Sequence, residues 1–341
     1  MDIRLKKLED QVIVITGASS GIGLTTARLA ARRGAKLVLA ARNGDALQKL
    51  ADELNGYGTS AVHVVADVSK EEDVRTIAST AIAQFGGFDT WINNAGVSIF
   101  GKLSEISLED QRRIFDINFW GVVHGSLVAA EHFKWRGGAL INLGSELSDC
   151  GITLQGIYAA SKHAVKGFTD SLRMELEEAG APVSVTLIKP AAVDTMFLAN
   201  AKNYMEVEPK LPAPIYAPEV VAEAILFAAE HPKRDIFVGS ASKLFSSGAH
   251  YFPQLMDRYM KRFASRQQRT DKPANSSAQD ALYWPGVGLQ ERLGYPGHVC
   301  ESSLYTRATT HPKTTGLALA GAGLALAAVW QSRQRAPRNL L

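Results

Sequence analysis

The chain has 341 residues, of which 46% are hydrophobic and 21% charged, and its formal net charge is +3. These values are ordinary for a globular protein with a full core, and the length allows one large domain or two. The charge is too small to indicate a nucleic-acid partner. The only cysteines, Cys150 and Cys300, exclude a disulfide framework and suit a reducing compartment. Residues 1–7 contain no apolar stretch typical of a secretory signal, so we expect a location on the cytosolic side.

Short apolar runs alternate with helical patterns between residues 11 and 240. We expect strands at residues 11–15, 36–40, 61–65, 90–93, 139–143, 183–188 and 235–238. We expect helices at residues 22–33, 43–54, 70–85, 108–133, 158–180 and 218–230. This alternation predicts an α/β fold, a doubly wound parallel sheet of the Rossmann type with helices on both faces.

The first predicted strand-to-helix turn reads Thr16-Gly17-Ala18-Ser19-Ser20-Gly21-Ile22-Gly23. Its three glycines permit a tight turn and a close approach of a pyrophosphate to the N-terminus of the next helix. Such a loop can also serve only to pack a helix against a strand. Its position in the first βα unit favours a nucleotide site.

Tyr158 and Lys162 stand four residues apart near the start of a predicted helix, so their side chains share one face. An ammonium beside a phenol lowers the phenol's pKa from ~10. The phenol can then exchange a proton with an alcohol or a carbonyl near neutral pH. The same pair is common on ordinary solvated helices, so its meaning depends on the motifs around it.

Several motifs occur in the order found in one family. The glycine turn has the spacing T-G-x-x-x-G-x-G, and it is followed by Asp67-Val68, Asn93-Asn94-Ala95-Gly96, Asn118, Ser145, Tyr158 and Lys162. Over residues 8–239 the chain therefore resembles the short-chain dehydrogenase/reductase family. The resemblance implies hydride transfer between a nicotinamide cofactor and an alcohol or carbonyl.

The resemblance also implies a role for each matching residue. Tyr158 would be the general acid and base, Lys162 would lower its pKa and hold the nicotinamide ribose, Ser145 would bind the substrate oxygen, and Asn118 would anchor a water for proton relay. The residues expected to bind the cofactor are Gly17, Ser19, Ser20, Gly21, Ile22, Gly23, Arg42, Asp67, Val68, Asn94, Ala95, Gly96, Tyr158, Lys162, Pro190, Val193 and Thr195.

Cofactor preference depends on the end of the second strand, where an enzyme selective for NAD carries an acidic residue. This chain has Ala41 followed by Arg42. A guanidinium without a competing carboxylate suits a 2′-phosphate, and Ser19 offers a further hydroxyl. Arg42 could also be a solvated residue of the helix that follows. We expect NADP(H) to be favoured over NAD(H).

The segment after the sixth strand departs from the family, which has Pro-Gly where this chain has Pro190-Ala191. Because alanine tolerates a positive φ poorly, the turn could be reshaped here. The following loop, residues 196–217, should cover the substrate, and its apolar side chains form either a lid or part of the core. An apolar lid predicts a small to medium hydrophobic substrate.

The chain divides into a catalytic domain at residues 1–240, an extension at 241–313 and an apolar segment with a basic tail at 314–341. Residues 250–266 predict one helix, either packed on the domain or lying on a membrane surface, and residues 269–279 predict a linker. Residues 314–330 carry no charged side chain and precede Arg333, Arg335 and Arg338. They indicate either membrane attachment or a helix buried against protein.

Three functions follow from these patterns. The first is an NADP(H)-dependent oxidoreductase acting on a small-molecule alcohol or carbonyl. The second is a nucleotide-binding regulator without turnover, and the third is a membrane-associated interaction protein. The eight histidines show no ligand-like clustering, so we predict no metal site. The family resemblance implies a homo-oligomer built through the helices around Asn118 and Tyr158.

Overall fold

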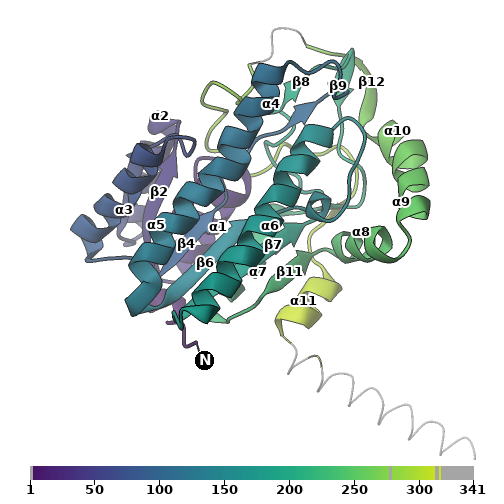
Figure 1. The fold of residues 1–341 in the computed structure, drawn as a ribbon. Coiled ribbons are helices and arrows are strands. Elements are labelled where there is room, and N and C mark those ends of the chain that lie inside the picture. Colours follow the sequence, from purple (N-terminus) through teal and green to yellow (C-terminus); the bar gives the residue numbers. More distant parts are fainter. Residues whose placement is uncertain (1–2, 276–278, 312–314, 316–341) are drawn as a thin grey trace, which may run out of the picture.

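A seven-stranded parallel sheet forms the centre of the molecule (Figure 1), which is known from a computed structural model describing residues 3–275, 279–311 and 315. Its strand order is β11-β7-β6-β4-β1-β2-β3, and every neighbouring pair is parallel. The strands are β1 (Val12–Thr16), β2 (Lys36–Ala41), β3 (Ala61–Val65), β4 (Thr90–Asn93), β6 (Gly138–Leu143), β7 (Val183–Pro190) and β11 (Asp235–Val238). The predicted fold class is confirmed. The chain order reverses between β1 and β4, and this switch point is where such sheets bind ligands.

Helices cover both faces of the sheet (Figure 1). One face carries α1 (Gly21–Arg32), α2 (Gly44–Gly56) and α7 (Pro218–Glu230). The other carries α3 (Glu71–Phe85), α5 (Gly121–Arg136) and α6 (Gly156–Glu178). The start of α2 follows the sequence signal, because the Asn43 side chain accepts a bond from the Ala46 amide at 3.0 Å.

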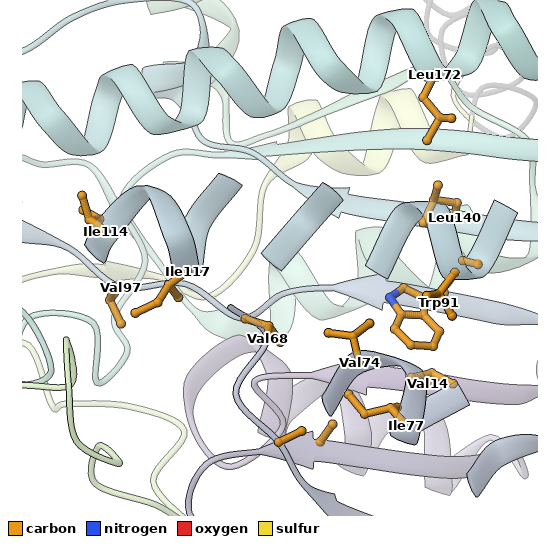
Figure 2. Close-up of a cluster of buried hydrophobic side chains, with 14 of the residues drawn as sticks. Val14, Val68, Val74, Ile77, Trp91, Val97, Ile114, Ile117, Leu140 and Leu172 are labelled. Carbon is orange, nitrogen blue, oxygen red and sulfur yellow. The ribbon is translucent and has the colours of Figure 1, made fainter. Parts of the chain in front are cut away.

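The core consists of apolar layers on the two faces of the sheet. Figure 2 shows part of one layer, in which Val14 and Trp91 lie by Val74 and Ile77 of α3, and Leu140 lies toward Leu172 of α6. Burying each such side chain contributes about 1.5–3 kcal/mol. These layers hold the strands in register and so fix the sheet edge from which the site residues project.

The helix predicted at residues 108–133 is interrupted. It runs as α4 (Leu108–Phe115), a π-helical turn η2 (Asp116–Trp120) and then α5. A π-helical turn contains one wide turn of backbone and is frequent at functional sites. Here it contains Asn118, which is fully buried.

The substrate-side loop is joined to the C-terminal extension by short strands. β9 (Val207–Pro209) pairs with β12 (Arg269–Pro273), and β10 (Ile215–Tyr216) pairs with β13 (Val299–Cys300). A further pair within the first 240 residues joins β5 (Ile99–Phe100) to β8 (Lys202–Asn203). The linker predicted at 269–279 is therefore wrong for its first five residues, which pair as a strand, and residues 276–278 lie outside the described residues.

The helix predicted at residues 250–266 is wrong in its extent. The structure has α8 (Ser240–Tyr251), then α9 (Pro253–Tyr259), η4 (Met260–Ala264) and α10 (Ser265–Gln267). The break falls at Phe252 because Pro253 has no N–H and takes the first position of α9. Met260 is buried against the domain, whereas Phe252 and Leu255 are exposed.

The extension ends in a short helix, α11 (Leu304–Thr310), that packs near α7 and β11. The predicted apolar segment 314–330 and its basic tail lie outside the described residues, apart from Thr315. Among the described helices, none has the length and apolar character needed to cross a bilayer.

Candidate active site

The glycine turn is held rigidly between β1 and β4. Gly17 and Gly21 have φ values of +67° and +54°, a region that favours glycine. A Cβ on Gly23 would lie 2.2 Å from the Gly17 carbonyl oxygen and 2.6 Å from Asn94 Nδ2. That Asn94 amide in turn donates to the Thr16 and Gly17 carbonyls at 2.9 and 3.2 Å. The turn therefore needs all three glycines, and Asn94 fixes it to the end of β4.

A cavity with an empty volume of about 970 Å³ opens above this turn. Most of the residues expected to bind a cofactor line it, namely Gly17, Ser19, Ser20, Gly21, Ile22, Arg42, Asp67, Val68, Asn94, Ala95, Gly96 and Thr195. Its glycines place no side chain between the cavity and the N-terminus of α1, the kind of place where phosphates bind. The hydroxyls of Ser19 and Ser20 and the Arg42 guanidinium are donors that suit the phosphates of a nucleotide. Gly23 lies behind the cavity and packs the turn.

A second cavity, of about 840 Å³, adjoins the first and shares Ile22, Asn94, Gly96, Thr195 and Phe197 with it. The expected residues Ser145, Tyr158, Lys162, Pro190 and Val193 line this second cavity. One continuous cleft therefore runs from Arg42 at the end of β2 to Tyr158 on α6.

Ser145, Tyr158 and Lys162 lie close together in the second cavity. Ser145 caps the short helix η3 (Glu146–Ser148), where its Oγ accepts from the Leu147 amide at 3.1 Å, and its hydroxyl lies close enough to Tyr158 to affect the pKa of the phenol. Lys162 Nζ donates to the Leu143 carbonyl at 2.8 Å and lies 5.8 Å from the centre of the Tyr158 ring. The three side chains share one compartment, where Tyr158 is 8% exposed.

Burial is the main cause of the shifted pKa values of Tyr158 and Lys162. Desolvation raises the pKa of Tyr158 above its ordinary value, the nearby Ser145 hydroxyl opposes that rise and the nearby Glu146 adds to it. Desolvation also lowers the pKa of Lys162 to about 8. The prediction that Lys162 lowers the pKa of Tyr158 is therefore wrong for the chain by itself, because the interior disfavours both charged forms.

Asn118 lies behind the cleft and lines neither cavity. Its side chain exchanges two 2.9 Å bonds with the backbone of Val97, and its amide donates to Ser161 Oγ at 3.2 Å. It thereby ties the segment after β4 to α6, the helix that carries Tyr158 and Lys162.

The segment after β7 keeps an ordinary backbone. Leu154 and Leu289 are the non-glycine residues with a positive φ in the described chain, so Ala191 does not adopt a left-handed conformation. A turn reshaped relative to the family stays a prediction. The loop beyond it supplies Phe197, whose ring meets that of Tyr158 edge-on at 5.4 Å. Leu211 and Pro212 also line the second cavity. These side chains form an apolar wall over the site.

Residues 11–205 match the family model described as short chain dehydrogenase. The chain belongs to the short-chain dehydrogenase family. The uncharacterized oxidoreductase YxnA of Bacillus subtilis is 51% identical over 322 residues, which cover 94% of this chain and 90% of the relative.

Two solved structures have the same architecture. A short-chain dehydrogenase/reductase of Burkholderia phymatum in complex with NAD is 29% identical, with a TM-score of 0.67, covering 80% of this chain and 100% of that one. An alcohol dehydrogenase of Thermococcus sibiricus complexed with 5-hydroxy-NADP is 29% identical, with a TM-score of 0.59, covering 67% and 95%. The family membership and the oxidoreductase class expected from the motifs are confirmed. The protein is an enzyme acting on CH–OH groups with a nicotinamide cofactor.

The C-terminal extension forms part of the first cavity of this dehydrogenase, and no sequence pattern predicts it. Residues 280–291, which we call the strap, cross the first cavity at the end of β2. The Arg42 guanidinium donates to the Ala281 carbonyl and, at 3.4 Å, to that of Leu282, and Asn43 Nδ2 donates to the Gly286 carbonyl at 3.0 Å. Ala281 and Gly286 line the cavity. Arg42 is thus a residue of the wall and not a freely solvated side chain.

The strap also contacts the glycine turn. The Leu289 amide donates to the Ser19 carbonyl at 2.8 Å, and the Gly21 amide donates to the Gln290 carbonyl at 2.9 Å. Leu289 has a φ of +59°, which is strained for a side chain branched at Cγ and costs of order 1–3 kcal/mol. At its far end Glu291 pairs with Arg28 of α1 at 2.9 Å.

Arg113 of α4 also contacts the strap, and the sequence analysis did not predict a role for it. It pairs with Asp67 at 2.6 Å and donates to the Leu282 carbonyl at 3.1 Å. Burial alone would raise the pKa of Asp67, but the bonds from Arg113 and Ser69 outweigh it, so the pKa is lowered. Arg113 therefore links the end of β3 to the strap. In the described part of the chain, no group of three His, Cys, Asp or Glu could hold a metal.

Proposed function

We propose that the enzyme interconverts an alcohol and a carbonyl by hydride transfer and that it favours NADP(H) over NAD(H). The observation that carries this proposal is the continuous cleft in which Ser145, Tyr158 and Lys162 adjoin the glycine turn. The nicotinamide, when bound, supplies the hydride chemistry. The residues of the chain bind the cofactor, orient the substrate and transfer the proton.

Tyr158 is the proposed proton donor in the direction of reduction. Its raised pKa keeps the phenol protonated, so it can give its proton to the substrate oxygen as the carbon gains hydride. The Ser145 hydroxyl, which lines the same cavity as Tyr158, donates to the same oxygen as charge develops there, a contribution of about 3 kcal/mol for donors of this kind. In oxidation the proton returns along the same path.

Lys162 is proposed to restore the proton of Tyr158 and to hold the nicotinamide ribose. Its pKa of about 8 lets it gain or lose a proton in the working range of pH. Asn118 acts behind it by holding the segment after β4 against α6, and we keep for it the water-anchoring role implied by the family.

The preference for NADP(H) rests on Ala41 and Arg42. Both line the first cavity, and the end of β2 carries no acidic side chain to bind a ribose 2′-hydroxyl. The two related structures hold NAD and 5-hydroxy-NADP respectively, so the family admits either cofactor. A guanidinium in this place favours a 2′-phosphate.

A panel of hydrophobic alcohols and ketones, followed by absorbance of the reduced cofactor, tests the proposal. We expect turnover with NADP(H) at a higher kcat/KM than with NAD(H), and a loss of at least 10²-fold in kcat for Tyr158→Phe. Nucleotide binding without turnover of any compound would instead support a regulatory protein. Equal rates for Tyr158→Phe and wild type would overturn the role of Tyr158.

A further inference from the structure

Glu146 is a buried carboxyl group in the wall of the substrate cavity. It follows Ser145 directly, in the short helix η3, and lines the same cavity as Ser145 and Tyr158. Its exposed fraction is 8%. The carboxyl lies near enough to the Tyr158 hydroxyl and to the Cys150 thiol for its charge to raise the pKa of both.

This carboxyl has unused hydrogen-bonding capacity. Its Oε2 atom is fully buried and has no hydrogen-bond partner among the described residues. An unsatisfied buried polar group costs about 1–3 kcal/mol, more if charged, so such groups are usually found where a ligand or water completes them. Burial raises the pKa of Glu146 to about 8. Near neutral pH the group is therefore an acid that can donate one hydrogen bond and accept another.

The rest of the cavity wall has few polar groups that could hydrogen-bond a substrate. It is largely apolar, formed by Leu143, Leu147, Ile152, Val193, Phe197 and Leu211. Gln155, Asn94 and Thr195 also line the cavity. The Gln155 amide donates to Ser98 Oγ at 3.1 Å, the Asn94 amide donates to the glycine turn, and Thr195 Oγ1 accepts from the Phe197 amide at 3.3 Å. Lys162 is engaged with the Leu143 carbonyl. Apart from Ser145 and Tyr158, Glu146 is thus a polar residue of this wall that can still form a hydrogen bond to a ligand.

We infer that Glu146 is a specificity-determining residue that hydrogen-bonds a second hydroxyl of the substrate. The substrate class is then a mainly apolar diol or hydroxyketone, with one oxygen at Tyr158 and the other at Glu146. The inference rests on the proposed function for the choice of the reacting oxygen. The apolar wall of loop 196–217 predicts a hydrophobic substrate, and this inference adds that the substrate carries a second polar group.

The test compares cyclohexanol with the 1,2-, 1,3- and 1,4-cyclohexanediols at saturating NADP⁺, using full-length wild type, Glu146→Gln and Glu146→Leu. Asp235→Asn is the control for a carboxyl outside both cavities: Asp235 Oδ1 is also buried without a hydrogen-bond partner, although it lies 3.8 Å from Lys189 Nζ. The readouts are kcat/KM and the thermal shift caused by each compound. A site built to bond a hydroxyl discriminates against the analogue that lacks it.

We expect the best diol to exceed cyclohexanol by at least tenfold in kcat/KM for wild type and for Asp235→Asn. The ratio should fall to within threefold for Glu146→Leu and keep most of its value for Glu146→Gln. An unchanged ratio in the leucine variant overturns the inference. A preference for 2-aminocyclohexanol that grows above pH 8 also overturns it, because the ionised Glu146 carboxylate would then bind a cationic group and not a hydroxyl.

The thermal shifts separate the two proposals. If no compound reacts but a diol stabilises wild type more than cyclohexanol does, and the leucine variant loses that difference, the inference stands and the proposed reaction fails. If no diol binds, the inference fails.

Discussion

Replacing Gly23 by alanine tests whether the glycine turn is built for a nucleotide. The new Cβ would lie 2.2 Å from the Gly17 carbonyl oxygen, and ordinary contacts begin near 3 Å. The carbonyl must therefore move by roughly 1 Å, a strain that costs about 1–3 kcal/mol in packed sites. Alanine regains about 1 kcal/mol through its higher helix propensity. The expected net loss in the free energy of unfolding is about 0–2 kcal/mol.

Binding should suffer more than stability does. The displaced Gly17 carbonyl and the Asn94 amide, which lies 2.6 Å from the new Cβ, both belong to the cavity wall that faces the cofactor. We expect the Kd for NADPH, measured by its fluorescence, to rise by at least tenfold, which corresponds to about 1.4 kcal/mol.

Gly167→Ala is the control, because no heavy atom lies within 4 Å of its added Cβ in the middle of α6. Urea unfolding should show it to be as stable as wild type or slightly more stable, with an unchanged Kd. Wild-type affinity in Gly23→Ala would refute the reasoning that close packing here serves nucleotide binding.

Three further predictions concern charge and packing. Because the folded pKa of Glu146 is raised from 4.5 to about 8, the acid form is favoured in the native state, and wild type should lose stability as pH rises from 5 to 8. Glu146→Gln removes that loss, so its stability relative to wild type should grow over this window by an amount on the order of 4 kcal/mol in urea unfolding; parallel pH profiles would contradict this. Lys162, with its pKa lowered to about 8, adds to stability only above that window. Arg42→Leu should raise KM for NADP⁺ by about 10- to 100-fold, as expected for a lost bond to a charged group, and raise KM for NAD⁺ far less; equal rises would mean that Arg42 acts only through the strap. Gly125→Ala should destabilise the fold by about 1–3 kcal/mol, because its Cβ would lie 2.1 Å from Asn93 Oδ1, and an unchanged urea midpoint would refute this.

The central sheet could be predicted because its strands are continuous apolar runs separated by helical patterns. All seven strands lie where the sequence indicated, with shifts of one or two residues at their ends. The glycine turn and the group of Ser145, Tyr158 and Lys162 could also be placed, because each follows directly from the end of a strand or the start of a helix. Their positions depend on local structure that the sequence specifies.

The strap could not be predicted, for a physical reason. Its contacts with Arg42 and with the glycine turn are made by backbone carbonyl and amide groups, which every residue type carries. Residues 280–291 show neither helical nor alternating periodicity, so no pattern marks them. The pairing of β12 with β9 was hidden in the same way, because residues 269–273 are polar and read as a linker.

The pKa of Tyr158 was misjudged because sequence spacing reports proximity but not burial. The spacing correctly placed Lys162 beside the ring. It gave no measure of the desolvation that raises the pKa of Tyr158 and lowers that of Lys162.

The contacts of the strap bear on how cofactor and product leave the enzyme. Asn200 belongs to the loop that also walls the substrate cavity, and its carbonyl and side chain accept from the strap amides of Ala281 and Val287 at 2.9 and 3.2 Å. A nucleotide that left the first cavity past the end of β2 would have to break these bonds, each worth about 1 kcal/mol, together with those to Arg42 and Arg113. If coenzyme leaves by this route, the loop and the strap would have to lift together, and coenzyme exchange and product escape would then share a physical barrier. In such an enzyme a mutation far along the chain, in the strap, can set the turnover number without touching a reacting atom.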